Sequence, residues 1–150
     1  MSQATLSILY ATETGNAEEL AERTAEKARE IGYTVSLSNV CEYDIKQLTE
    51  ERLVLVIAST WGDGDPPEEA VEFSEALDDA TLDLSGTSYC ILALGDTDYT
   101  EFCGFGRKLD NDFKRLGARC ILDRKDLDVD YEEDYEAWCT AFIDTLEAQK

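Results

Sequence analysis

The chain of 150 residues carries 34 acidic and 13 basic side chains and no histidine, which gives a net charge of −21 at pH 7. Such a surface repels nucleic acid and anionic membranes, so we expect neither as a partner. The five cysteines show no CxxC spacing, and no apolar run after Met1 is long enough for a signal or a membrane span. We therefore expect one cytoplasmic domain over 1–150, with reduced thiols.

Strand-like and helix-like runs alternate along the whole chain. The strands are expected at 6–10, 34–37, 53–58, 89–94 and 118–122, and the helices at 17–31, 67–77, 106–116 and 132–146, with a weaker helix at 43–51. Continuous apolar runs at 53–58 and 90–94 are typical of central parallel strands. The alternation predicts an α/β fold with a doubly wound, five-stranded parallel sheet, order 2-1-3-4-5, and helices on both faces. In such sheets ligands bind at the carboxyl ends of the strands.

The loop after the first strand is rich in hydroxyl groups and has no basic residue. Thr12, Thr14 and Asn16 offer side-chain donors, and Gly15 allows the backbone to approach a ligand closely. A phosphate bound here would rest on amides, hydroxyls and a helix N-terminus. A capping box without any ligand explains Thr14 and Asn16 equally well. The loop matches neither the Walker pattern nor GxGxxG, which disfavours a nucleoside triphosphate or a dinucleotide.

Aromatic residues occur in the loops after the third and fourth strands. Trp61 stands in a glycine-rich loop, which favours a stacking surface over core packing. Gly62 and Gly64 permit a positive φ, so that a peptide beside a bound ring is able to turn over. Tyr99 is a candidate for the opposite jaw of an aromatic clamp, although a simple loop cluster with Phe102 fits as well.

Three segments together resemble, in order and spacing, the three FMN loops of the flavodoxin family. They are TETGNAE at 12–18, STWGDGDP at 59–66 and LGDTDYTEFC at 94–103. The likeness is greatest to the FMN modules of NADPH-cytochrome reductase, nitric oxide synthase and sulfite reductase, and to short MioC-type flavodoxins. The resemblance implies a flavodoxin-like fold and FMN as cofactor. It assigns the FMN phosphate to the first loop, through Thr12, Glu13, Thr14, Gly15, Asn16 and Ala17.

The resemblance also assigns the two faces of the isoalloxazine ring. One face and the N5 edge would be lined by Ser59, Thr60, Trp61, Gly62, Asp63 and Gly64. The other face and the pyrimidine side would be lined by Leu94, Gly95, Asp96, Tyr99, Phe102 and Cys103. Asp128 or Asp130 would lie near the ring from the loop after the fifth strand. We expect Cys103 to pack near the ring without reacting, and we predict no catalytic and no metal-binding residue.

The expected function is that of a one-electron carrier, because FMN itself supplies the chemistry. The chain ends at Lys150 without an FAD or NADPH module. We therefore expect a monomer that needs a flavin reductase of the FAD/NADPH type as donor and a redox protein as acceptor. No Lys or Arg occurs from Leu53 to Gly106 or from Asp126 to Gln149. In this context the acids predict a docking face for basic partners, although a merely solvated surface explains them too.

Two other functions are compatible with the predicted strand order. An FMN-dependent quinone or nitro reductase would need a nicotinamide site, for which the sequence offers no basic or glycine-rich candidate. A receiver domain would need paired acids after the first strand and a phosphorylatable Asp at the end of the third. The chain has Thr12-Glu13 and Ser59-Thr60 at those places, and only Lys125 fits the receiver pattern.

Overall fold

A central parallel sheet organises the molecule. The computed structural model describes residues 4–12, 15–60, 64–96 and 103–149. The strands are β1 (Thr5–Ala11), β2 (Thr34–Asn39), β3 (Leu53–Ser59), β4 (Ser88–Leu94), β5 (Arg119–Cys120) and β6 (Lys125–Leu127). All pairings are parallel in the order β2-β1-β3-β4-β5, and β6 also pairs with β4. The predicted fold class and strand order are therefore confirmed.

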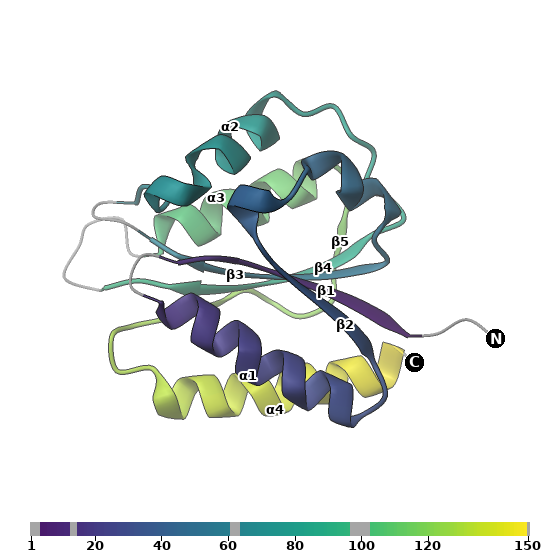
Figure 1. Ribbon diagram of the computed structural model, residues 1–150, viewed down its shortest axis with the longest axis vertical. Helices are drawn as coiled ribbons and strands as arrows, with labels where there is room; N and C mark the ends of the chain where they lie inside the picture. The colour runs from purple at the N-terminus through teal and green to yellow at the C-terminus, as the bar shows by residue number, and fades with distance from the viewer. Residues whose placement is uncertain (1–3, 13–14, 61–63, 97–102, 150) are drawn as a thin grey trace.

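Helices cover both faces of this sheet (Figure 1). The helices α1 (Asn16–Glu30) and α4 (Glu132–Gln149) lie on one face, and α2 (Val71–Asp79) and α3 (Gly104–Arg115) lie on the other. Three short 3₁₀ helices are η1 (Val40–Glu42), η2 (Ile45–Glu50) and η3 (Glu68–Ala70). Among the described residues, no helix has the length and the apolar composition that crossing a membrane requires.

The sheet separates two hydrophobic cores. Successive side chains of a strand point to opposite faces, so Leu55 and Ile57 join the core under α1 and α4 while Val54 and Val56 join the core under α2 and α3. Every residue of β3 is buried. A strand covered on both faces needs apolar residues at every position, which explains the continuous apolar run in the sequence.

Several element boundaries differ from the sequence prediction. The weak helix at 43–51 is the 3₁₀ helix η2, and the helix expected at 67–77 begins as η3 and continues as α2 to Asp79. The fifth strand is not continuous from 118 to 122. It is split into β5 and β6, with residues 121–124 between them. From Tyr89 to Leu92 the strand β4 advances three residues, while the opposite chain advances five from Cys120 to Lys125, so a continuous ladder is impossible.

Close packing of α3 on β4 depends on Gly106. Replacing Gly106 by Ala is expected to lower the free energy of unfolding by about 1–3 kcal/mol, because the added Cβ would lie 2.3 Å from Ala93 Cβ. Urea unfolding measures the change. The control is Gly86→Ala, since a Cβ at Gly86 meets no atom within 4 Å. Equal stability of the two variants would contradict the packing argument.

Candidate functional site

The carboxyl ends of β1, β3 and β4 lie at one edge of the sheet, on the left in Figure 1. The register places Ala11 opposite Ala58 and Ser59 opposite Leu94. The amide of Thr60 extends this ladder by donating to the Leu94 carbonyl at 2.9 Å. Parallel pairing thus brings the loops after these three strands, which hold most of the predicted site residues, to the same edge.

The first loop leads into α1 without a side-chain cap. Gly15 is the N-cap residue, with a φ of 92° and no side-chain cap hydrogen bond. Its amide donates to Thr12 Oγ1 at 2.8 Å, and the first helical bond runs from Glu19 N to Gly15 O at 3.0 Å. The amides of residues 16–18 therefore have no acceptor within the helix, which is the donor arrangement that binds a phosphate.

These contacts bear on the capping-box alternative. Asn16 is the first residue of α1 rather than its cap, so its side chain does not close the helix end. Ala17 is completely buried, and its backbone amide is the polar group that it has available for a ligand. The predicted site residues Glu13 and Thr14 lie outside the described residues.

A carboxylate joins the first loop to the segment that follows the second. The amide of Thr12 donates to Glu69 Oε1 at 2.9 Å, across 57 residues of sequence. Glu69 belongs to η3, directly before α2. The sequence prediction did not include this residue, because Glu69 lies in an acidic run whose members look alike in the sequence.

The second loop is connected to the helix that follows the third. Ser59 is buried at the end of β3, and Thr60 Oγ1 accepts a hydrogen bond from the amide of Phe105 at 3.3 Å, in the first turn of α3. Gly64 has a φ of 108°, the left-handed conformation that the sequence analysis anticipated for it. Trp61, Gly62 and Asp63 lie outside the described residues, so their predicted places at the ring stay predictions.

The third loop closes on β6 through Gly95 and Cys103. The amide of Gly95 donates to the Leu127 carbonyl at 2.9 Å, and Cys103 Sγ lies 3.8 Å from the same oxygen. A Cβ at Gly95 would lie 2.9 Å from both N and Sγ of Cys103, so no larger residue fits there without a shift. The Leu94 side chain packs into the core. Asp96 is half-buried, whereas Tyr99 and Phe102 lie outside the described residues.

The segment after β6 approaches the first loop. Asp128 is half-buried and accepts a hydrogen bond from the amide of Val129 at 2.8 Å. Beside it opens a hollow of about 470 Å³, which is lined by Asn16, Val129, Asp130, Tyr131, Glu132 and Glu133. Asp130 thus lies next to Asn16, while the prediction that Asp128 or Asp130 comes near the ring stays a prediction.

Burial governs the chemistry of Cys103. It raises the pKa of this thiol from 9.0 to about 12, and nearby Asp126 acts in the same direction. A thiol with such a pKa remains protonated at neutral pH and is a poor nucleophile. The burial of Cys103 is consistent with a packing role, and its expected place near the ring stays a prediction.

Comparison with known proteins decides the family. The model of the flavodoxin family matches residues 8–138. The chain belongs to the flavodoxin family. The sulfite reductase [NADPH] flavoprotein alpha-component of Cronobacter sakazakii is 39% identical over 145 residues, which are 96% of this chain and 24% of that protein. The chain thus spans about a quarter of the length of this curated relative.

Solved flavodoxins have the same architecture over their full length. The Streptococcus pneumonia TIGR4 flavodoxin superposes with a TM-score of 0.84 at 34% identity, covering 98% of this chain and 100% of that one. Flavodoxin 1 of Bacillus cereus shares the fold with a TM-score of 0.85 at 23% identity, over 98% and 99% of the two chains. As a member of this family, the chain is an FMN-binding electron-transfer unit, and the uncapped amides at residues 16–18 fit the phosphate of this cofactor.

Gly15→Ala is expected to weaken FMN binding about fivefold or more, because a non-glycine residue at φ 92° costs about 1–2 kcal/mol and the loop would relax away from the phosphate. Titration of the apoprotein with FMN, followed by flavin fluorescence, measures the dissociation constant. Gly117→Ala is the control: Gly117 has a φ of 96° but lies between α3 and β5, near the opposite edge of the sheet. Both variants should lose similar stability, and equal FMN affinities would contradict the assignment.

Cys103 is expected to resist iodoacetamide at pH 8 in the folded protein, while the exposed Cys41 reacts, as peptide mass spectrometry would show. The pKa of Cys103 is higher in the folded state than in the unfolded state. The contribution of Cys103 to the free energy of unfolding is therefore full below about pH 9 and is lost as pH rises towards 12. Across that pH range, the free energy of unfolding of Cys103→Ser should therefore decline less steeply than that of the unsubstituted protein. Rapid native alkylation of Cys103 would contradict the burial.

Proposed function

We propose that this protein accepts single electrons from a reductase of the FAD/NADPH type and passes them to an acceptor protein, and that both partners dock on the acidic carboxyl edge of the sheet. The observation that carries the proposal is the surface around that edge. Val129 is 62% exposed and Val71 is 38% exposed, and they are the exposed large hydrophobic residues among those that the structure describes. Both lie in segments that adjoin the carboxyl edge.

Acidic side chains surround both valines. Glu68, Glu72 and Glu75 are exposed beside Val71. Asp130 and Glu133 are exposed beside Val129, and Glu132 between them pairs with Arg23. A small apolar contact within a charged rim is the arrangement expected of a transient docking site, in which charge guides encounter and little area is buried. The negative potential favours partners with a basic face.

FMN supplies one-electron redox chemistry when it is bound. The chain's own groups hold and surround it. The amides at residues 16–18 bind the phosphate, and Gly95 with Cys103 forms a close-packed wall on the third loop. The acids at the edge disfavour the addition of negative charge to a nearby ring, because like charges repel. The proposed carrier therefore works at low potential.

We further propose that the chain is a single-domain, monomeric carrier without substrate chemistry of its own. The absence of histidine from the sequence supports this, since it removes the commonest general base. Steady oxidation of NADPH by the purified, FMN-loaded protein alone would contradict it. A cytoplasmic location is supported by the five cysteines, all of which are free.

Electron transfer from the reduced protein to cytochrome c, a basic acceptor, is expected to slow about tenfold between low and physiological ionic strength, because salt screens the acidic edge. Transfer to ferricyanide, an anionic acceptor, should quicken over the same range. Stopped-flow absorbance measures both rates.

Charge neutralisation at single sites locates the docking face. Asp130→Asn should reduce the low-salt rate with cytochrome c, whereas Glu30→Asn should not, because Glu30 ends α1 at the opposite edge of the sheet. The docking proposal fails if salt leaves the cytochrome c rate unchanged, or if the two variants slow it equally.

A further inference from the structure

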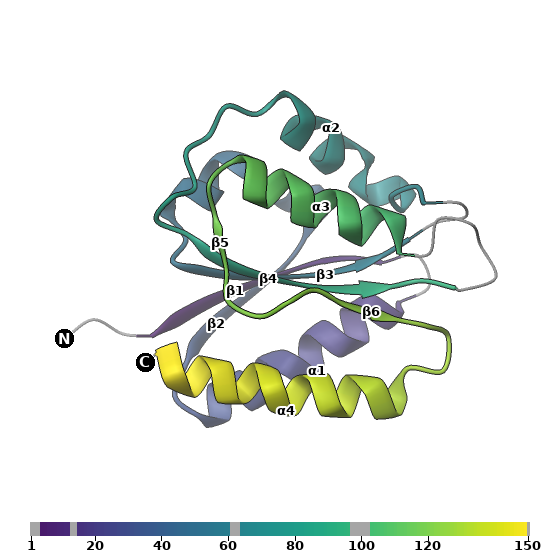
Figure 2. The ribbon, with the colours of Figure 1, turned by 180° about the vertical axis from the view of Figure 1, so that it is seen from behind.

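The strand that pairs with the outer side of β4 is interrupted between β5 and β6. Cys120 pairs with Tyr89 and Lys125 pairs with Leu92, so four residues, 121–124, span a gap that two residues of β4 span on the other side. Figure 2 shows β6 following this irregular segment and leading towards α4. With three residues, β6 has few ladder bonds to hold it against β4. Other contacts must therefore fix its position.

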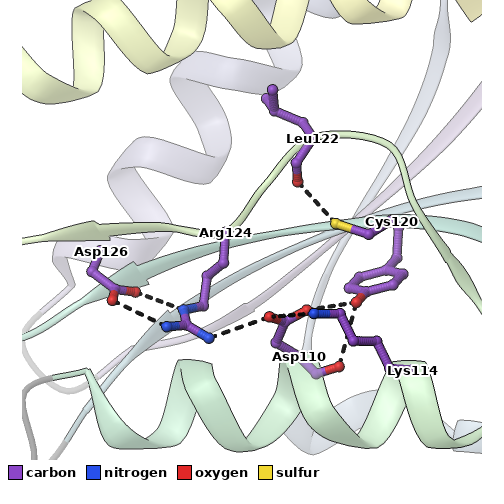
Figure 3. Close-up of polar contacts among 7 residues, drawn as sticks. Asp110, Lys114, Cys120, Leu122, Arg124 and Asp126 are labelled. Atoms are coloured by element: carbon purple, nitrogen blue, oxygen red, sulfur yellow. Dashed lines mark hydrogen bonds and ion pairs between the residues drawn. The ribbon is translucent and has the colours of Figure 1, made fainter.

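Arg124, the last residue of the irregular segment, supplies such contacts. Its Nε donates to Asp126 Oδ1 at 2.9 Å and its Nη2 donates to Asp126 Oδ2 at 3.3 Å, a bidentate pairing with β6. Its Nη1 donates to Asp110 Oδ2 at 3.2 Å, on α3. Figure 3 shows the guanidinium between these two carboxylates. One planar cation thus joins the short strand β6 to the helix α3.

The helix end of this bridge is itself fixed. Asp110 has a side chain only 9% exposed, and its Oδ1 accepts a hydrogen bond from the hydroxyl of Tyr89 at 2.5 Å. Tyr89 belongs to β4 and stacks on Phe113 with ring centroids 5.1 Å apart. Lys114 Nζ lies 3.5 Å from Asp110 Oδ2, but its side chain is 58% exposed. Without Arg124, the buried Asp110 would keep only this weak ionic partner among those described.

The strand end of the bridge reaches the third loop. Asp126 is followed by Leu127, whose carbonyl oxygen accepts a hydrogen bond from the amide of Gly95 and lies near Cys103 Sγ. Asp128 comes next, directly after the end of β6. The placement of residues 126–128 therefore determines how the third loop closes. It also determines where the carboxylates of Asp126 and Asp128 lie.

We propose that Arg124 is a positioning residue of the FMN site, which bridges Asp126 and Asp110 so that residues 126–128 are held against Gly95 and Cys103. The proposal depends on the fork geometry of the guanidinium as well as on its charge, because a lysine ammonium cannot make the bidentate pairing and reach Asp110 at once. It deepens the electron-carrier function and rests on it for its flavin readouts. One arm of the test is therefore independent of FMN.

Amide hydrogen exchange of the apoprotein tests the bridge directly. Arg124→Gln is expected to speed exchange of the Gly95 amide about tenfold, because its acceptor on β6 is no longer held in place. Arg119→Gln is the matched control. It also removes one positive charge, but Arg119 lies in β5, and the one hydrogen bond of its guanidinium within the described part of the chain is to Ser88 Oγ, at 3.5 Å. Should Arg124→Gln fail to fold, Asp126→Asn opens the β6 end of the bridge alone.

Two flavin measurements test the positioning role. Arg124→Gln is expected to raise the FMN dissociation constant about tenfold, and Arg124→Lys should raise it nearly as much. The midpoint potentials of bound FMN should become more negative in Arg124→Gln than in Arg119→Gln, since a cation next to the site favours the reduced, more negative cofactor. A merely structural role would leave the potentials of the two variants alike.

The outcomes separate the bridge from the function it serves. Unchanged Gly95 exchange, full rescue of FMN affinity by Arg124→Lys, or equal potentials of Arg124→Gln and Arg119→Gln would each overturn the proposal. If the unsubstituted protein bound no FMN, the electron-carrier function would fail, and the exchange measurement on the apoprotein would still decide whether Arg124 holds β6.

Discussion

The parallel pairing of β3 with β1 and β4 is the constraint on which the rest of the structure depends. Because β3 is buried along its whole length, its neighbours must pair along both edges and helices must cover both faces. Parallel strands with a common register end together, so three loops from distant parts of the sequence meet at one edge. The candidate site is a consequence of this arrangement, since each loop supplies a different part of it.

The elements that the sequence predicted well are those whose signal is local. The continuous apolar run of β3 and the helical spacing of α1 each determine their own conformation, and the order of elements then limits the topology to few choices. The fifth strand was predicted wrongly because its extent depends on what it pairs with. Two extra residues between Cys120 and Lys125 interrupt the ladder, and nothing in the sequence of this segment records the spacing of β4. The weak helix at 43–51 became η2 for a similar reason, since its few apolar residues do not favour one helical period over another.

In the candidate site, too, features with a local sequence signal were predictable, and contacts between distant elements were not. Gly15 was predictable, because a glycine between a hydroxyl-rich turn and a helix indicates the left-handed conformation that it adopts. The contacts that join one loop to another were not predictable. The Glu69 carboxylate accepts a hydrogen bond from the amide of Thr12, 57 residues away in the sequence. The Thr60 hydroxyl accepts one from the amide of Phe105, 45 residues away. Arg124 belongs to this second group, since its partner Asp110 lies in another element and looks in the sequence like any surface acid of an amphipathic helix.

The distribution of the few basic residues links the fold to the function. Arg23 pairs with Glu132 and Glu136, Lys108 pairs with Asp78 and Asp112, and Arg124 pairs with Asp110 and Asp126. Each cation thus neutralises acids that the fold brings together, and several of these acids are at least partly shielded from solvent, where an unpaired charge is costly. A phosphate bound by backbone amides requires no further cation. Acids at the carboxyl edge such as Asp130 and Glu133 therefore keep their negative field, so that the same shortage of basic residues that shapes the phosphate loop also preserves the proposed docking surface.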